Sequence, residues 1–286
     1  MKRSLILACV TILSMVCAAS AFAQPRFSRN EVIEIWPNGA PNSNGDTSAD
    51  APVAKLTIYP AMKPNGQAIL CLPGGGYAML SKTHEGGDMA TWFNSMGVTF
   101  ALLEYRLPKG HKEIPLSDAQ QAMRLLRERA EKLGITKLGV LGCSAGGHLT
   151  STVATHYVDA ATRPDFQILF YPVITMDKAY THMSSHDLLL GENASEADEI
   201  LFSNEKQVTP DTCPAFIMHS TDDMLVPVKN SLLYYEALVK NKVSATMHIY
   251  PVGGHGWGIG DRFPYKSDWQ ADLERWLRIV IGKNSC

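Results

Sequence analysis

Short apolar runs alternate along this chain with longer segments in which apolar residues recur every three or four positions. The short runs are rich in β-branched and aromatic residues and are bounded by glycine, proline or asparagine, which is typical of strands. They predict strands at 55–59, 68–72, 98–105, 137–141, 166–174, 215–219 and 245–250.

The longer segments have the helical period. They predict helices at 84–96, at 117–133, directly after Ser144, at 231–240 and at 268–281. In the last of these, we expect one face to be buried, formed by Trp269, Leu273, Trp276 and Leu277. Strands that alternate with helices predict a mostly parallel sheet with helices on both faces, so the fold class is α/β.

One segment breaks this alternation. Residues 175–212 contain few strand signals and many polar residues, and they lie between two predicted strands. Ligands of parallel α/β sheets bind at the C-terminal edge of the strands. We therefore expect 175–212 to be a small insertion over that edge and over the active site.

The first 23 residues have the three parts of a bacterial secretory signal peptide. Lys2 and Arg3 give a positive start, residues 5–16 are apolar, and AFA at 21–23 is a small-x-small cleavage site. The apolar part is too short to span a bilayer well. We therefore expect one domain at 24–286, periplasmic or secreted, with no stable membrane insertion after the signal is cleaved.

Composition excludes several classes of protein. The 286 residues are 45% hydrophobic and 19% charged, with a net charge of −2 at pH 7, unlike a disordered chain or a multi-span membrane protein. The balanced charge gives no reason to expect a nucleic acid as a partner. Cys71, Cys143, Cys213 and Cys286 follow the predicted signal, and three of them lie in apolar strand-like runs, so we assign no disulfide.

The candidate nucleophile is Ser144, at the centre of a G-x-S-x-G sequence at 142–146. This pentapeptide follows a predicted strand and precedes a predicted helix, which is the context in which such a serine is exposed on a sharp turn. The small neighbours avoid clashes in that turn. The N–H of Ala145, at the start of the helix, is then available to an oxyanion.

The candidate base and acid follow later in the chain. His255 lies between glycines after the last predicted strand, where a neutral imidazole could take the serine proton. Asp222 and Asp223 follow the preceding strand, and a carboxylate there could accept the His255 Nδ1–H. The D-x-x-V-P register favours Asp223, with Asp222 as the alternative acid. The order Ser, Asp, His is that of α/β-hydrolases.

A glycine-rich loop, LPGGGY at 72–77, follows an earlier strand. Its backbone amides could donate further hydrogen bonds to the oxyanion, each worth about 3 kcal/mol of transition-state stabilisation. The loop lacks the Lys-Ser/Thr that a phosphate-binding P-loop would carry.

Several motifs together carry a family resemblance. They are WP at 36–37 with GAP at 39–41, LPGGGY at 72–77, HEG at 84–86, EYRLP at 104–108, GCSAGGHL at 142–149, FYPV at 170–173, HSTDDMLVPVKNS at 219–231 and GGHGWG at 253–258. With these motifs the chain resembles α/β-hydrolase fold serine esterases, in particular the bacterial group of bifunctional feruloyl and acetyl-xylan esterases. Pro73 stands where lipase-like relatives carry a histidine, which argues against carrying lipid substrates over.

The resemblance implies an eight-stranded, mostly parallel sheet and substrates that are acyl groups on plant cell-wall sugars, either acetyl or feruloyl. It implies a catalytic triad of Ser144, Asp223 and His255. It implies an oxyanion hole formed by Gly75, Gly76 and Ala145.

Other residues have structural or accessory interpretations. Tyr77 and Trp257 are candidates for lining the substrate cleft. His148, one turn after Ser144, is expected in the core, and Arg106 is expected in a structural ion pair.

His182 and His186 have i, i+4 spacing. They lack the glutamate motif and the third ligand that a zinc site would need, so we expect no metal.

The expected reaction is ester hydrolysis through an acyl-enzyme, on a small-molecule or oligosaccharide ester and without a metal or organic cofactor. The same triad would serve a serine peptidase or a general small-ester hydrolase. A non-catalytic binding module on a hydrolase scaffold is the alternative of another class, although it would normally have lost the serine or the histidine. Labelling of Ser144 by a fluorophosphonate separates the enzyme from the module.

Overall fold

The computed structural model describes residues 30–46 and 53–282. The expected signal peptide at 1–23 lies outside these residues. Within the described residues, no helix combines the length and apolarity needed to cross a bilayer.

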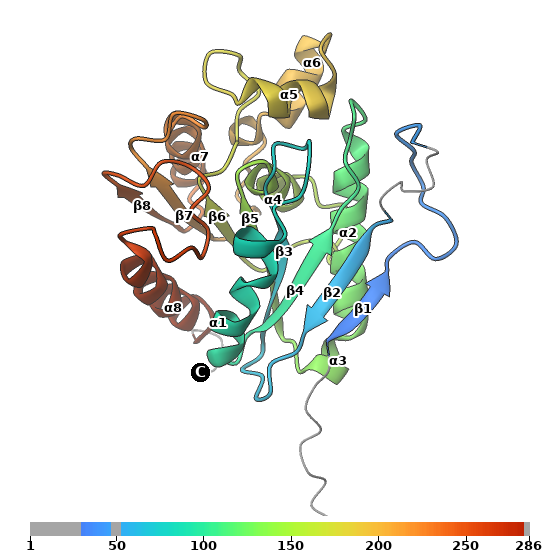
Figure 1. The fold of residues 1–286 in the computed structure, drawn as a ribbon, viewed down its shortest axis with the longest axis vertical. Coiled ribbons are helices and arrows are strands. Elements are labelled where there is room, and N and C mark those ends of the chain that lie inside the picture. The colour runs from blue at the N-terminus through green and yellow to red at the C-terminus, as the bar shows by residue number, and fades with distance from the viewer. Residues whose placement is uncertain (1–29, 47–52, 283–286) are drawn as a thin grey trace, which may run out of the picture.

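A single eight-stranded sheet forms the centre of the molecule (Figure 1). Its strands are β1 (Glu31–Glu34), β2 (Lys55–Tyr59), β3 (Gln67–Leu72), β4 (Thr99–Glu104), β5 (Lys137–Cys143), β6 (Gln167–Phe170), β7 (Ala215–Ser220) and β8 (Ala245–Tyr250). The spatial order is β1-β2-β4-β3-β5-β6-β7-β8. β2 pairs antiparallel with both β1 and β4, and every other neighbouring pair is parallel. The expected mostly parallel α/β sheet is confirmed.

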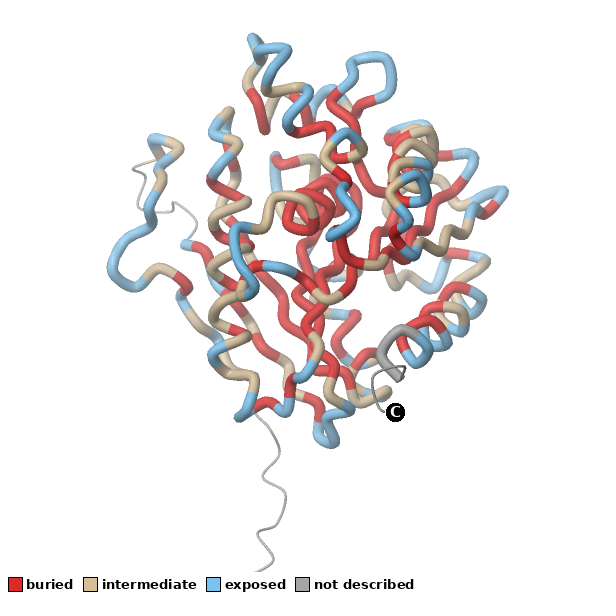
Figure 2. Tube along the Cα trace, turned by 180° about the vertical axis from the view of Figure 1, so that it is seen from behind, coloured by how far each residue is buried: buried red, intermediate tan, exposed pale blue. Residues whose placement is uncertain are grey.

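Helices cover both faces of this sheet. α1 (Met89–Ser95) and α8 (Lys266–Gly282) pack on one face, and α2 (Glu113–Glu128), α4 (Ala145–Thr155) and α7 (Lys229–Lys240) pack on the other. Both faces of the central strands are therefore buried, as Figure 2 shows. This explains why these strands read as continuous apolar runs.

The closing helix buries the face that the sequence predicts. Trp269 and Leu273 are fully buried in α8, and Trp276 and Leu277 are nearly so. Trp269 meets Phe170 of β6 edge to face at 5.2 Å between ring centroids.

Two expected elements differ in detail. The helix expected at 84–96 is split into a π-helical turn, η1 (Thr83–Gly87), and α1, because Gly86 has the non-helical angles φ −147° and ψ −114°. The helix expected at 117–133 begins earlier, at Glu113, and breaks at Arg129 before the short α3 (Ala130–Leu133).

Two strands also differ. β1 was not predicted, because a four-residue edge strand with one face in solvent has too few apolar positions to stand out. β6 ends at Phe170, earlier than expected, because Tyr171 has φ 35° and Pro172 has no N–H to donate.

The segment 175–212 contains α5 (Met183–Leu190), α6 (Glu196–Phe202) and the 3₁₀ turn η2 (Asn204–Lys206). Figure 1 shows α5 and α6 above the carboxyl ends of the parallel strands. A Cβ atom placed on Gly76 would lie 3.6 Å from Cε1 of His182, which precedes α5. The expected position of the insertion over the C-terminal edge is confirmed.

Candidate active site

Ser144 forms the turn between β5 and α4 by itself. Its angles are φ 54° and ψ −121°, outside the regions that side-chain-bearing residues normally occupy. The turn is tight enough that a Cβ atom on Gly146 would lie 2.0 Å from the carbonyl oxygen of Leu72. Glycine at 146 is therefore required for α4 to approach the end of β3, and the expected strand–serine–helix turn is present.

A chain of two short hydrogen bonds begins at this serine. The Ser144 Oγ lies 2.8 Å from Nε2 of His255, and Nδ1 of the same ring lies 2.7 Å from Oδ2 of Asp223. The three residues follow β5, β8 and β7, respectively, and so converge at the carboxyl edge of the sheet. Nδ1 faces a carboxylate, so we assign the proton to it, which leaves the Nε2 lone pair for the serine hydroxyl.

The carboxylate of Asp223 is buried and surrounded by donors. Its Oδ1 accepts the N–H groups of Leu225 and Val226, both at 2.9 Å. Its Oδ2 also lies 3.3 Å from Nε2 of the buried His219. Burial by itself raises the pKa of Asp223, but hydrogen bonds from His219, His255 and Val226 outweigh it and hold the pKa well below its usual range. This acid therefore stays ionised.

Asp222 does not contact His255. It is exposed, and its two carboxylate oxygens accept the N–H groups of Gly253 (3.2 Å) and Gly254 (2.8 Å). Of the two acids that the sequence left open, the structure thus brings Asp223 to the imidazole. Asp222 holds the backbone that leads to His255.

The glycine-rich loop lies against the serine turn. A Cβ atom on Gly74 would lie 3.1 Å from Cβ of Ser144. The Gly74 N–H donates to Oε2 of Glu85 at 3.2 Å, whereas the N–H groups of Gly75 and Gly76 have no acceptor among the described residues. The N–H of Ala145, in the first turn of α4, is likewise left without an intrahelical acceptor. Two adjacent amides of this loop and the first amide of α4 thus have no acceptor among the described residues.

Tyr77 and Trp257, which we expect to line the cleft, are both largely buried. Tyr77 is 1% exposed, and its hydroxyl lies 3.0 Å from Nδ1 of His148. Trp257 is 7% exposed, donates to Ser220 Oγ at 3.1 Å and stacks on Phe263 at 4.0 Å between ring centroids. Both rings pack into the core because aromatic burial and a hydrogen-bond partner for the polar tip are available there.

His182 is a residue at the site that the sequence analysis did not assign to it. It is partly exposed before α5, close to Gly76, and its Nδ1 lies 2.8 Å from Ser185 Oγ. Burial lowers the pKa of His182, and the charge of nearby His255 lowers it further. His186 instead is fully buried between Asp187 and Glu199. Among the residues that the structure describes, no group of three or more His, Cys, Asp and Glu residues is arranged to hold a metal.

The remaining expectations concern the interior. His148 is buried, with Nε2 2.8 Å from the Phe202 carbonyl oxygen, and Arg106 pairs with the buried Asp118 at 2.7 Å. Both are structural, as expected. The described cysteines, Cys71, Cys143 and Cys213, are buried free thiols, and Cys286 lies outside the described residues.

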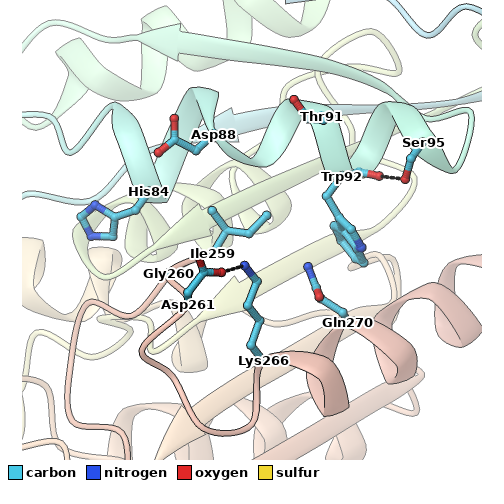
Figure 3. Close-up of a pocket in the computed structure, with 10 residues that line it drawn as sticks. All are labelled: His84, Asp88, Thr91, Trp92, Ser95, Ile259, Gly260, Asp261, Lys266 and Gln270. Carbon is cyan, nitrogen blue, oxygen red and sulfur yellow. Dashed lines mark hydrogen bonds and ion pairs between the residues drawn. The ribbon is translucent and has the colours of Figure 1, made fainter.

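A separate surface groove of about 610 Å³ lies between α1 and the start of α8 (Figure 3). It is lined by Trp92 and Ser95 of α1, by His84, and by Ile259 and Gly260 of the loop after His255, among others. Ser144, His255 and Asp223 do not line this outer groove.

Comparison with known proteins identifies the family. The model of the BD-FAE family matches residues 56–238, which include Ser144 and Asp223. Over 233 residues the chain is 38% identical to an acetylxylan esterase of Xylanibacter ruminicola, covering 79% of this chain and 48% of that protein. Over 211 residues it is 39% identical to endo-1,4-beta-xylanase B of Butyrivibrio fibrisolvens, covering 68% of this chain and 33% of that protein.

The chain therefore spans less than half the length of each of these two relatives. A solved structure matches it almost end to end. The acetyl ester-xyloside bifunctional hydrolase of Caldicellulosiruptor lactoaceticus superposes with a TM-score of 0.79 at 36% identity, covering 91% of this chain and 98% of that one. The resemblance drawn from the motifs is confirmed: the chain belongs to the BD-FAE family and has the α/β-hydrolase fold.

Proposed function

We propose that this protein is a serine carboxylesterase that removes acyl groups from xylan-type saccharides through a covalent acyl-enzyme. The observation that carries the proposal is the hydrogen-bonded chain from Ser144 through His255 to Asp223. The relatives named for acetylxylan and xylan chemistry support the substrate class. The proposed activity and mechanism rest on this hydrogen-bonded chain, and the proposed substrate rests on the relatives.

In the first step, His255 Nε2 takes the proton of Ser144 as Oγ attacks the ester carbonyl carbon. The 2.8 Å separation of the two atoms is within hydrogen-bond reach. The imidazolium that forms is stabilised by the ionised Asp223 at Nδ1. His255 then gives its proton to the departing alcohol oxygen, which leaves the acyl group on Ser144.

The carbonyl oxygen gains a negative charge when the tetrahedral intermediate forms. The free N–H groups of Gly75, Gly76 and Ala145 are the donors that we assign to it. In the second step, water attacks the acyl-enzyme, His255 takes its proton, and the acid is released as Ser144 is reprotonated. No step calls for a metal or an organic cofactor.

We further propose that the protein is exported. The charged start, apolar stretch and AFA site at 1–23 have the organisation of a cleavable signal peptide. Acylated polysaccharide fragments are encountered outside the cytoplasm, so export and substrate agree. Determining the N-terminal residue of the protein recovered from the periplasm or medium tests this proposal, with Gln24 expected.

The activity is tested with the protein lacking 1–23 and with its Ser144→Ala variant. Both are incubated with acetylated xylo-oligosaccharide and with methyl ferulate, and the released acid is measured. Release from either substrate, abolished in the variant, supports the esterase and identifies its acyl group. Release that persists in the variant contradicts the serine mechanism, and free xylose in the mixture would reveal glycosidic cleavage. If neither substrate releases acid but a fluorophosphonate still labels Ser144, the cell-wall substrate is contradicted and the serine hydrolase is not.

A further inference from the structure

Glu85, the central residue of the HEG motif, has a buried carboxylate that the mechanism above does not use. It lies in η1 and is only 4% exposed. No ion pair of the described residues includes it. A carboxylate taken out of water with neutral partners alone is costly, so its position calls for a reason other than fold stability.

One carboxylate oxygen of Glu85 controls the glycine-rich loop. Oε2 accepts the N–H of Gly74 at 3.2 Å. Of the three consecutive amides at 74–76, this is the one with an acceptor among the described residues. Glu85 thus occupies the first amide, and those of Gly75 and Gly76 remain without an acceptor among the described residues. Gly74 itself lies between the carboxylate and the serine, since its Cβ would be 2.4 Å from Oε2 and 3.1 Å from Ser144 Cβ.

The other carboxylate oxygen reaches the loop that carries the base. Oε1 accepts the hydroxyl proton of Tyr171 at 2.8 Å, and the Tyr171 oxygen accepts the N–H of Gly258 at 2.8 Å. The Tyr171 ring packs against the His255 ring, with 4.7 Å between centroids. Tyr171 holds this position with φ 35°, a backbone angle that a bulky residue adopts only where its surroundings impose it.

A backbone hydrogen bond also connects the HEG turn with the loop that carries His255. The Ile259 N–H donates to the carbonyl oxygen of His84 at 3.0 Å, so the loop after His255 is bonded directly to the HEG turn. The His84 side chain is partly exposed and lines the outer groove (Figure 3). His84 therefore offers a matched control: it is adjacent to Glu85 in sequence, and its side chain makes none of the contacts to Gly74 or Tyr171.

We propose that Glu85 is a positioning residue that, through Gly74 on one side and Tyr171 on the other, sets the oxyanion donors and the imidazole of His255 in register across Ser144. This inference rests on the proposed esterase function. Both halves of the reaction centre are loops, and Glu85 links them, directly at Gly74 and through the Tyr171 hydroxyl at Gly258. Catalytic donors tolerate displacements of only about 0.5 Å. Loss of the link should therefore weaken transition-state stabilisation and leave ground-state binding of the ester unchanged.

The test uses Glu85→Gln, Tyr171→Phe, the double variant and the control His84→Ala. The kcat and KM for 4-nitrophenyl acetate are measured, with the active fraction titrated by a fluorophosphonate. We expect Glu85→Gln and Tyr171→Phe to lower kcat by about 10- to 100-fold at unchanged KM. The double variant should be little worse than Glu85→Gln, because both changes break one network. His84→Ala should match the wild type.

A boronic acid that mimics the tetrahedral intermediate separates positioning from mere loss of folded protein. Its inhibition constant does not depend on the active fraction, and we expect it to rise in Glu85→Gln in parallel with the fall in kcat/KM. An unchanged inhibition constant, or a fall in kcat that the active fraction accounts for, overturns the proposal. If the wild type does not hydrolyse the ester, the proposed esterase function fails. The positioning role of Glu85 is then tested by the rate at which a fluorophosphonate labels Ser144. Slower labelling in both single variants supports positioning, and equal labelling refutes it.

Discussion

The imidazole of His219 lies 3.3 Å, through Nε2, from Oδ2 of Asp223, the same oxygen that faces His255. The ring is fully buried. Its Nε2 is also 2.9 Å from the Val226 carbonyl oxygen, and its Nδ1 is 2.8 Å from Ser231 Oγ. Nε2 faces two acceptors, so we assign the proton to it, and His219 thus donates to the same carboxylate oxygen that accepts from His255.

Removing this ring should destabilise the fold. His219→Leu leaves the Val226 carbonyl and the Ser231 hydroxyl buried without partners, which we expect to cost about 2–5 kcal/mol in the free energy of unfolding. The matched control is His248→Leu, because His248 is partly exposed and its pair with Asp272 is 3.5 Å long. The control should cost about 1 kcal/mol or less. Guanidinium unfolding measures both, and equal losses would show that the buried contacts of His219 contribute nothing.

The two adjacent aspartates should differ sharply in their effect on turnover. Asp223→Asn removes the acceptor that fixes the His255 tautomer, and a change of this kind lowers kcat by about 10,000-fold. Asp222→Asn keeps an amide oxygen for one of the Gly253 and Gly254 amides, so its kcat should fall by about tenfold or less. Steady-state kinetics of the two folded variants decides between them. A larger loss for Asp222→Asn would assign the triad acid the other way.

The serine turn should not tolerate a methyl group at position 146. In Gly146→Ala the new Cβ would meet the Leu72 and Pro73 carbonyl oxygens at 2.0 and 2.5 Å, and no side-chain rotation can relieve backbone contacts. We expect a stability loss of about 1–3 kcal/mol from overpacking. Because the displaced backbone leads into the glycine-rich loop, kcat should fall by about 100-fold as well.

Gly191→Ala is the control for backbone strain. Gly191 has φ 89° and would place its Cβ in open space. With ψ 154° its backbone lies in a region that only glycine adopts readily, so the change should cost about 1–3 kcal/mol and leave kcat unchanged. Full activity in Gly146→Ala would contradict the close approach of α4 to the end of β3.

Stability should fall on mild acidification, in part because of His148. Burial lowers the pKa of His148 to about 4, opposed by its hydrogen bond to the Phe202 carbonyl, from an ordinary value of 6.5. Between pH 6.5 and 4 the unfolded chain binds a proton that the folded chain does not, so the free energy of unfolding decreases as pH falls through this window. The decrease from this group amounts to about 3 kcal/mol by pH 4.

His148→Gln removes this titration and retains an N–H donor for the Phe202 carbonyl. Denaturant unfolding measured from pH 7 to pH 4 should give a shallower decline for this variant than for the wild type. The decline should not vanish, because burial also lowers the pKa of His156 and His182. Parallel curves for the two proteins would contradict this prediction, because they would show that His148 takes up its proton at the same pH in the folded protein as in the unfolded chain.

Much of the fold could be predicted because its signals are local. Strands β2 and β8 have the predicted bounds, and the buried face of α8 follows from the spacing of its four apolar residues. Where a predicted helix was wrong in detail, the cause is local as well. Gly86 adopts angles that interrupt a helix, and its neighbours in sequence do not reveal this.

The candidate site divides in the same way. Ser144 and His255 could be singled out because each lies in a glycine-rich turn after a strand, and the structure joins them at 2.8 Å. The deep burial of Tyr77 and Trp257 could not be foreseen, because nearness in sequence to a site residue does not tell which way a ring points. Glu85 and His219 stood in the quoted motifs without a role, since their partners lie in other elements of the sheet.

The sequence by itself determined the alternation of strands and helices outside β1 and the 175–212 segment, the turn at Ser144, and the set of residues from which a reaction centre could be drawn. These depend on period, on glycine placement and on contacts within a few residues. Only the tertiary structure decided that Asp223 and not Asp222 meets His255, and that Glu85 joins the glycine-rich loop to Tyr171. Such pairings are distances between the ends of different strands. They are set by sheet register and by the packing of both faces, so a local pattern such as the D-x-x-V-P register can favour one residue but cannot fix the pairing.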